Sequence, residues 1–309
     1  MKEHKSKLNK TGACVAMVAL FLATRTLLAI MKPGHLNGLY VILATVLVVL
    51  VMMLVQLALV QSVVWIGLRP KQSALWALFS AVVFVGGLYL LTHGMKAYAN
   101  QPVVVGVHQL SLMLLAVFLG VTISYIIREP NILLPVTMVA ASVDFWNIYV
   151  GLLGHIVATK PAIVNAVTVQ MPVPVPGMPI PMIGMGDFVF LALYLSVVYR
   201  FGLNIRGTFW WGYALLTLTM LAVLRYDLPI PALVPMAIVV IGANARRIHL
   251  KRDELIATIF VGVIALALLG ASGVYMLKHN PIPKGPSSKS QIQGSKSKQP
   301  AAGTLNIEH

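Results

Sequence analysis

Acidic residues and cysteine are both scarce in this chain of 309 residues, which has eight Asp and Glu residues and one cysteine. The single cysteine, Cys14, excludes an internal disulfide framework and a site of several thiolate ligands. None of the eight histidines lies at metal-ligand spacing with a second ligand. We therefore expect no metal and no other cofactor.

Charge of either sign is also rare, at 10% of residues against 59% hydrophobic residues. A soluble domain carries about 25% charged residues, so this apolar surface indicates a bilayer as its solvent. A net charge of +15 would suggest nucleic acid in a soluble protein. Here the basic residues lie in loops and termini, and no basic motif with interleaved aromatics is present. They are better explained as topology signals that face anionic lipid headgroups, and no nucleic acid is expected.

Long apolar runs predict an all-α, polytopic transmembrane helix bundle, because a spanning helix needs about 20 mostly apolar residues. About nine spans are predicted, with boundaries uncertain by several residues: 13–31, 39–66, 72–92, 103–127, 131–157, 183–203, 208–225, 229–245 and 255–277. The first run is long and no small-residue cleavage site follows it, which favours a retained span over a signal peptide.

The rest of the chain divides by composition into a basic N-terminal segment, 1–12, a transmembrane domain, 13–278, and a disordered basic tail, 279–309. Most Lys and Arg residues of the short loops share one side with the N-terminus, which predicts a cytoplasmic N-terminus. One long loop, 158–182, has prolines at alternate positions and is expected to be extended. Two interpretations of it stay open: a segment at the membrane surface or over a cleft, and a stiff linker.

Only two of the acidic residues, Asp144 and Asp187, fall within predicted spans. An ionisable group inside a bilayer costs about 2.5–3.5 kcal/mol or more, so it indicates function by default. At helical spacing Asn147 lies on the face of Asp144, together with Gly151 and His155. We expect this face to turn into the bundle, with Asn147 near Asp144 and His155 at the interface.

Asp187 closes the sequence Gly184-Met185-Gly186-Asp187 at the start of its span. Glycine removes side chains beside the carboxylate and lets another backbone come close. Tyr194 shares the face of Asp187, and it either lines the site or packs in the core.

Proline interrupts the start of the eighth span, at Pro229, Pro231 and Pro235. Broken backbone at membrane depth survives only against protein or a watery cavity. This segment is therefore expected to face a wet site, although proline is also common at an ordinary helix entry.

Together these features resemble the presenilin and signal-peptide-peptidase family of intramembrane aspartyl proteases. That family has one aspartate in a helix, a second in a Gly-x-Gly-Asp motif opening the next helix, and a Pro-Ala-Leu motif further on. Here the order is Asp144, Gly184-Met185-Gly186-Asp187 and Pro231-Ala232-Leu233, within residues 131–245. The sequence departs from the family in having Val143 where a tyrosine is usual. It also has four predicted spans before the Asp144 helix, where the family has five, and a further span at 255–277.

The resemblance implies an aspartic endopeptidase that cleaves within transmembrane segments of other proteins or within signal peptides. Asp144 and Asp187 would be the catalytic pair, sharing one proton as general acid and base. The site would be supported by Gly184, Met185, Gly186, Pro231, Ala232 and Leu233. Expected partners are these substrates and membrane lipid, and no oligomeric state is predicted. Three alternatives stay open: a type IV prepilin peptidase, an ion- or proton-coupled transporter, and a catalytically silent family member.

Overall fold

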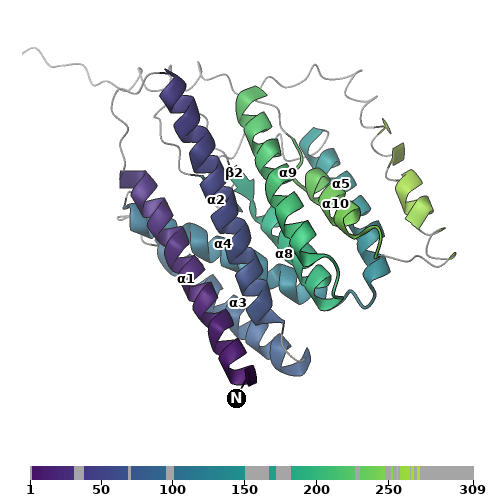
Figure 1. The fold of residues 1–309 in the computed structure, drawn as a ribbon, viewed down its shortest axis with the longest axis horizontal. Helices are drawn as coiled ribbons and strands as arrows, with labels where there is room; N and C mark the ends of the chain where they lie inside the picture. The colour runs from purple at the N-terminus through teal and green to yellow at the C-terminus, as the bar shows by residue number, and fades with distance from the viewer. Residues whose placement is uncertain are drawn as a thin grey trace, which may run out of the picture.

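The computed structural model describes residues 2–30, 38–68, 71–94, 101–149, 167–171, 182–226, 230–247 and scattered positions between 252 and 271. These residues form a helical bundle with one small two-stranded sheet (Figure 1). The elements are α1 (Lys2–Ile30), α2 (Gly38–Gly67), α3 (Lys71–Gly94), α4 (Pro102–Ser124), η2 (Pro130–Ile132), α5 (Leu133–Tyr149), β1 (Thr168–Gln170), β2 (Met182–Gly184), α8 (Met185–Arg200), α9 (Ile205–Tyr226) and α10 (Leu233–Asn244).

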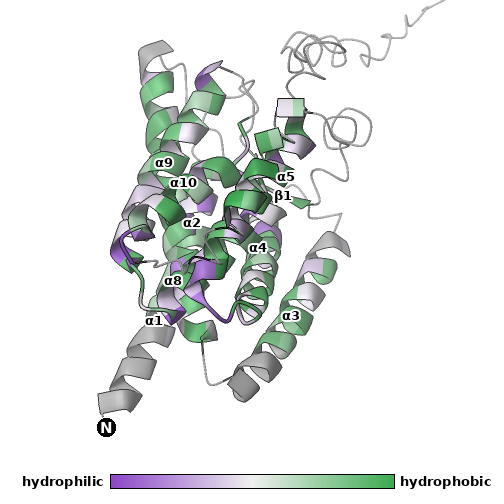
Figure 2. Ribbon diagram, turned by 90° about the vertical axis from the view of Figure 1, so that its right-hand side faces the viewer, coloured by the Kyte–Doolittle hydropathy of each residue, from purple (hydrophilic) through white to green (hydrophobic). Residues whose placement is uncertain are grey.

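Among the described residues, five stretches of helix are long and apolar enough to cross a membrane: Thr11–Leu28, Ile42–Ile66, Pro102–Ser124, Pro130–Ile148 and Ile205–Tyr226. Two shorter apolar stretches, Ala81–Leu91 and Leu233–Asn244, lie in α3 and α10. Apolar residues dominate the helices (Figure 2), and large side chains such as Phe84 and Trp211 are exposed. A helical membrane bundle is thereby confirmed in outline, while the number of nine spans stays a prediction.

Helix α8 lies in the interior of the bundle, because α2, α4, α9 and α10 all pack against it. Its buried side chains divide between two apolar clusters: Phe188, Ala192 and Leu195 in one, and Leu193, Tyr194 and Val197 in the other. A helix that is apolar on all sides belongs in the interior. The Asp187 carboxylate is therefore carried by the element that the rest of the bundle surrounds.

Helices α4 and α8 meet at Gly120. A Cβ added at this glycine would lie 2.2 Å from the carbonyl oxygen of Val189 and 2.9 Å from the Cβ of Ala192. Small residues at helix–helix contacts let backbones approach closely, and dispersion forces then stabilise the pair. This contact sets the position of α8 two residues beyond Asp187.

The segment before α8 corrects one predicted boundary. Ile183 and Gly184 fall in the predicted span 183–203, but the structure places them in β2, which pairs antiparallel with β1. Gly184 has extended dihedrals, φ −67° and ψ 148°, so the helix begins at Met185. The predicted extended loop is extended at Thr168–Gln170 and at Met182.

Several predictions fall on residues outside the described ranges. These are the end of the Asp144 span (150–157), the loop positions 158–166 and 172–181, most of 255–277 and the tail 279–309. The basic N-terminal segment, in contrast, is described from Lys2 onward and continues the helix of the first span as α1.

The far end of α10 is fastened to the turn between α8 and α9. The buried side chain of Asn244 accepts a hydrogen bond from the Asn204 backbone N–H at 2.8 Å and donates to the Thr208 hydroxyl at 3.0 Å. Arg247 donates to the Gly202 carbonyl at 3.0 Å. Gly202 has a positive φ of 62°, a conformation that glycine adopts without strain. These bonds hold α10 against the turn that ends α8.

Candidate functional site

Asp144 lies near the C-terminal end of α5 and is half-buried. Its Oδ2 accepts a hydrogen bond from the backbone N–H of Leu233 at 3.0 Å. Leu233 is the first residue of α10, and the N-cap residue, Ala232, makes no side-chain cap. The first N–H groups of a helix lack partners inside the helix and favour negative charge. Asp144 therefore caps α10 from another part of the chain.

Asp187 is the third residue of α8, and its side chain is partly covered. Its Oδ2 accepts a hydrogen bond from the backbone N–H of Gly184, the N-cap, at 3.1 Å. This is one half of a capping box, in which an acidic side chain at the third position reaches back to the N-cap. Gly184 has no side chain to supply the other half. The carboxylate thus joins the start of α8 to the end of β2.

The two carboxyl groups lie on helices that share a neighbour. Helix α10 joins them structurally, since it packs against both α5 and α8. Each carboxyl binds a backbone N–H through Oδ2. Within the described ranges, neither Oδ1 has a hydrogen-bond partner. Two neighbouring carboxyl groups with free oxygens can hold a water molecule and exchange a proton with it.

The proline-broken segment contacts the candidate site through Leu233. Ile230 and Pro231 are not helical, Ala232 is in a turn and the helix starts only at Leu233. Pro231 and Leu233 are buried. The predicted interruption is therefore present. The backbone N–H of Leu233, where the helix starts, donates its hydrogen bond to Asp144.

The glycines before Asp187 leave open space. A Cβ added at Gly186 would meet nothing within 4 Å, and Gly186 is exposed. A Cβ added at Gly184 would lie 3.5 Å from Oδ2 of Asp187, an ordinary contact. Met185, between them, packs against the buried core. The described chain thus does not fill the space beside Gly186, where another backbone can approach.

Other residues on the predicted faces have different positions. Asn147 is exposed, so the expectation that it faces the interior beside Asp144 is wrong. The reason is that α5 packs mainly on α10, which leaves this part of the helix uncovered by described residues. Gly151 and His155 lie outside the described ranges. Tyr194 is 1% exposed and packs in the core, where its hydroxyl lacks a hydrogen-bond partner among described residues.

Counting only acidic residues misses Arg25, a basic residue inside the predicted span 13–31. It is 7% exposed, and its Nη1 donates to the Gln170 carbonyl oxygen of β1 at 2.6 Å. The signal was present in the sequence, because a charge of either sign is unexpected within a span. In the described part of the chain, no three His, Cys, Asp or Glu residues are grouped so that they could hold a metal ion.

Comparison with known protein families, curated proteins and solved structures finds no match to this chain. The assignment of a function therefore depends on the chemistry of the site.

Proposed function

We propose that this protein is an intramembrane aspartyl protease in which Asp144 and Asp187 form the catalytic pair. The observation that carries the proposal is the hydrogen bond between Asp144 and Leu233. It joins the first aspartate to the Pro231-Ala232-Leu233 motif, which is far away in sequence. Helix α10, which begins at this bond, also packs against α8, the helix that carries the second aspartate. The proposal includes a core over 131–245 similar to that of presenilin and signal peptide peptidase, and about nine spans.

Hydrolysis of a peptide bond by this pair needs one ionised and one protonated carboxyl group. Two neighbouring carboxyls share a proton readily, since both cannot ionise easily. The ionised carboxylate takes a proton from water, and the resulting hydroxide attacks the scissile carbonyl carbon. The protonated carboxyl donates a hydrogen bond to the carbonyl oxygen. A proton then passes to the amide nitrogen, and the C–N bond breaks. All of these steps use only the two aspartates and water.

The substrate would be a transmembrane segment, and it must unwind to expose its carbonyl groups. The strand β2 offers an extended template, because it pairs with β1 on one edge and leads directly into the Gly184–Asp187 turn. No described strand pairs with its other edge. An extended peptide that adds to this edge gains main-chain hydrogen bonds, and its backbone lies beside the open space at Gly186.

The test is cleavage of a fluorogenic transmembrane reporter peptide by the full-length protein in proteoliposomes, with Asp144→Asn and Asp187→Asn as variants. Asparagine keeps the Oδ acceptor for the N–H groups of Leu233 and Gly184, so both helix starts stay capped. Each variant is expected to lose about 10²–10⁴-fold in rate. Glu129→Gln, at an exposed position, is the matched control and should cleave at the wild-type rate. Wild-type cleavage by both aspartate variants would reject the proposal.

A second measurement separates an active enzyme from a silent one and from a transporter. A photoreactive transition-state analogue of aspartyl proteases should label the wild type and not Asp187→Asn. Gradient-driven proton uptake by liposomes, without labelling or cleavage, would support the transporter instead.

A further inference from the structure

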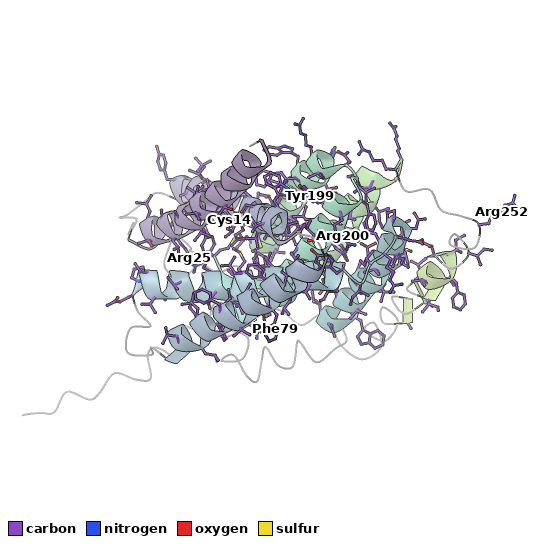
Figure 3. The ribbon with its side chains drawn as sticks, turned by 90° about the horizontal axis from the view of Figure 1, so that it is seen from below. Cys14, Arg25, Phe79, Tyr199, Arg200 and Arg252 are labelled. Carbon is purple, nitrogen blue, oxygen red and sulfur yellow. The ribbon has the colours of Figure 1, made fainter. Side chains whose placement is uncertain are left out.

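Arg25 is a charged side chain buried where the chain would cross the membrane. It lies in the spanning stretch Thr11–Leu28, and Figure 3 labels it on α1. A guanidinium near the end of a span ordinarily reaches for water at the interface. Here the residue is 7% exposed and binds the backbone carbonyl of Gln170 instead. Among the described residues, no carboxylate pairs with it. The hydrogen bond to β1 is thus the polar contact that the structure shows for the Arg25 guanidinium.

The bond leads by a short path to Asp187. Gln170 is the register partner of Met182, and Thr168 is the partner of Gly184, in the antiparallel pair of β1 and β2. The backbone N–H of Gly184 donates a hydrogen bond to the carboxylate of Asp187. Arg25 therefore holds one strand of a hairpin whose other strand carries the hydrogen-bond donor of Asp187.

The surroundings of Arg25 are shaped for this contact. A Cβ added at Gly106 of α4 would lie 3.9 Å from Cδ of Arg25 and 3.5 Å from Cδ2 of Leu22. These are ordinary contact distances, so the stem of the arginine packs beside α4 at Gly106. Helix α4 also contacts β1 directly, and Val169 between the strand ends is completely buried. Both α4 and the guanidinium thus contact this strand.

The geometry points to Arg25 as a positioning residue that keeps β1 paired with β2 and so sets the backbone beside Asp187. Its effect on cleavage rests on the proposed protease function, whereas its effect on the hairpin does not. Loss of the guanidinium should loosen the β1–β2 pair, displace the Gly184 N–H and lower kcat. It need not affect the remainder of the bundle, because α1 keeps its packing on α2 and α4.

The hairpin is tested by cross-linking the cysteine pair Gln170→Cys/Met182→Cys in a Cys14→Ser background of the full chain. Facing residues of an antiparallel pair have Cα atoms about 4.5–5.5 Å apart, within the range that a disulfide bridges. We expect rapid disulfide formation with Arg25 present and several-fold slower formation in Arg25→Gln. Arg206→Gln, which removes the same charge at an exposed position on α9, is the matched control and should cross-link like the parent protein.

Cleavage of the transmembrane reporter is measured on the same proteins. Arg25→Gln should lower kcat about 10- to 100-fold, since misplacement of a reacting group by about 1 Å has effects of that size. Arg25→Lys keeps a hydrogen-bond donor, so its kcat should fall less than that of Arg25→Gln. Closing the disulfide in Arg25→Gln should restore cleavage, which a general packing role would not predict.

The outcomes separate the two proposals. Cross-linking and cleavage at parent levels in Arg25→Gln would overturn the positioning role. If Arg25→Gln does not fold, Arg25→Lys decides. Slower cross-linking in Arg25→Lys than in Arg206→Gln supports the role of the guanidinium, and cross-linking and cleavage equal to those of Arg206→Gln overturn it. A wild type that cleaves no reporter, but whose cross-linking depends on Arg25, would reject the protease and support Arg25 as the anchor of the hairpin.

Discussion

The carboxylate of Asp144 accepts a hydrogen bond from the backbone N–H of Leu233, and 89 positions separate the two residues in the sequence. The bond gives Asp144 two proposed roles, because Oδ2 caps α10 while Oδ1, which no described residue binds, is left for catalysis. The first prediction separates these roles.

Asp144→Ala should lower stability more than Asp144→Asn, although both abolish cleavage. Alanine leaves the Leu233 N–H without its acceptor, which costs about 1–3 kcal/mol in a buried setting, whereas asparagine keeps an oxygen in the same place. Thermal unfolding in detergent micelles measures the difference. Equal melting temperatures for the two variants would show that the bond contributes nothing to folding.

Gly186→Leu should fold normally and cleave poorly. A Cβ at this exposed position meets nothing within 4 Å, so the larger side chain should be accommodated, but it would occupy the space proposed for the substrate backbone. We expect kcat/KM for the reporter to fall by roughly tenfold or more, about 1.4 kcal/mol, mainly through KM. Gly87→Leu on α3 is the control, because that glycine is also exposed with nothing within 4 Å. Equal activity of both variants would contradict an approach of substrate at Gly186.

Gly120→Ala and Gly212→Ala should change stability in opposite directions. Alanine in a helix is favoured over glycine by about 1 kcal/mol, and at Gly212 the added Cβ would have only an ordinary contact at 3.8 Å, with Val239. At Gly120 the same Cβ would overlap the backbone of α8, and overpacking costs about 1–3 kcal/mol. Thermal unfolding should therefore show Gly120→Ala as the less stable variant. A stabilised Gly120→Ala protein would mean that α4 and α8 separate easily.

Asn244→Ala should destabilise the protein by about 1–3 kcal/mol, because the Asn204 backbone N–H loses its acceptor in a buried place. Asn147→Ala is the matched control at an exposed position, where substitutions usually stay within about 0.5 kcal/mol. The control should also cleave the reporter at the wild-type rate, since the exposed side chain of Asn147 does not supply the hydrogen bond that Asp144 accepts. Reduced cleavage in Asn147→Ala would restore the earlier expectation that it supports Asp144.

The parts of the fold that could be predicted are those that depend on neighbours in sequence. Runs of about 20 apolar residues predicted the helices, and proline at 231 predicted the delayed start of α10. The predicted span was started too early, at Ile183, because apolar residues continue without a break from the strand Met182–Gly184 into the helix that follows. Only pairing with Thr168–Gln170 distinguishes the two.

The candidate site could be predicted as a set of residues and not as an arrangement. Hydropathy singled out Asp144 and Asp187, because a carboxylate in an apolar run is costly wherever the run ends up. Helical spacing predicted that Asn147 lies on the inner face of its helix, and the packing of α5 on α10 contradicts this prediction. Helical periodicity gives the faces of a helix, but it does not say which face a neighbour covers.

The sequence by itself determined that this chain is a helical membrane protein with two acids in its apolar runs, since both properties follow from local composition. Tertiary structure alone decided that Asp144 binds Leu233, that Gly120 meets the Val189 carbonyl, and that Arg25 reaches Gln170. Each of these contacts joins segments that are far apart in sequence. Their formation depends on how the helices pack. The local sequence pattern does not indicate which backbone group will come within hydrogen-bond distance.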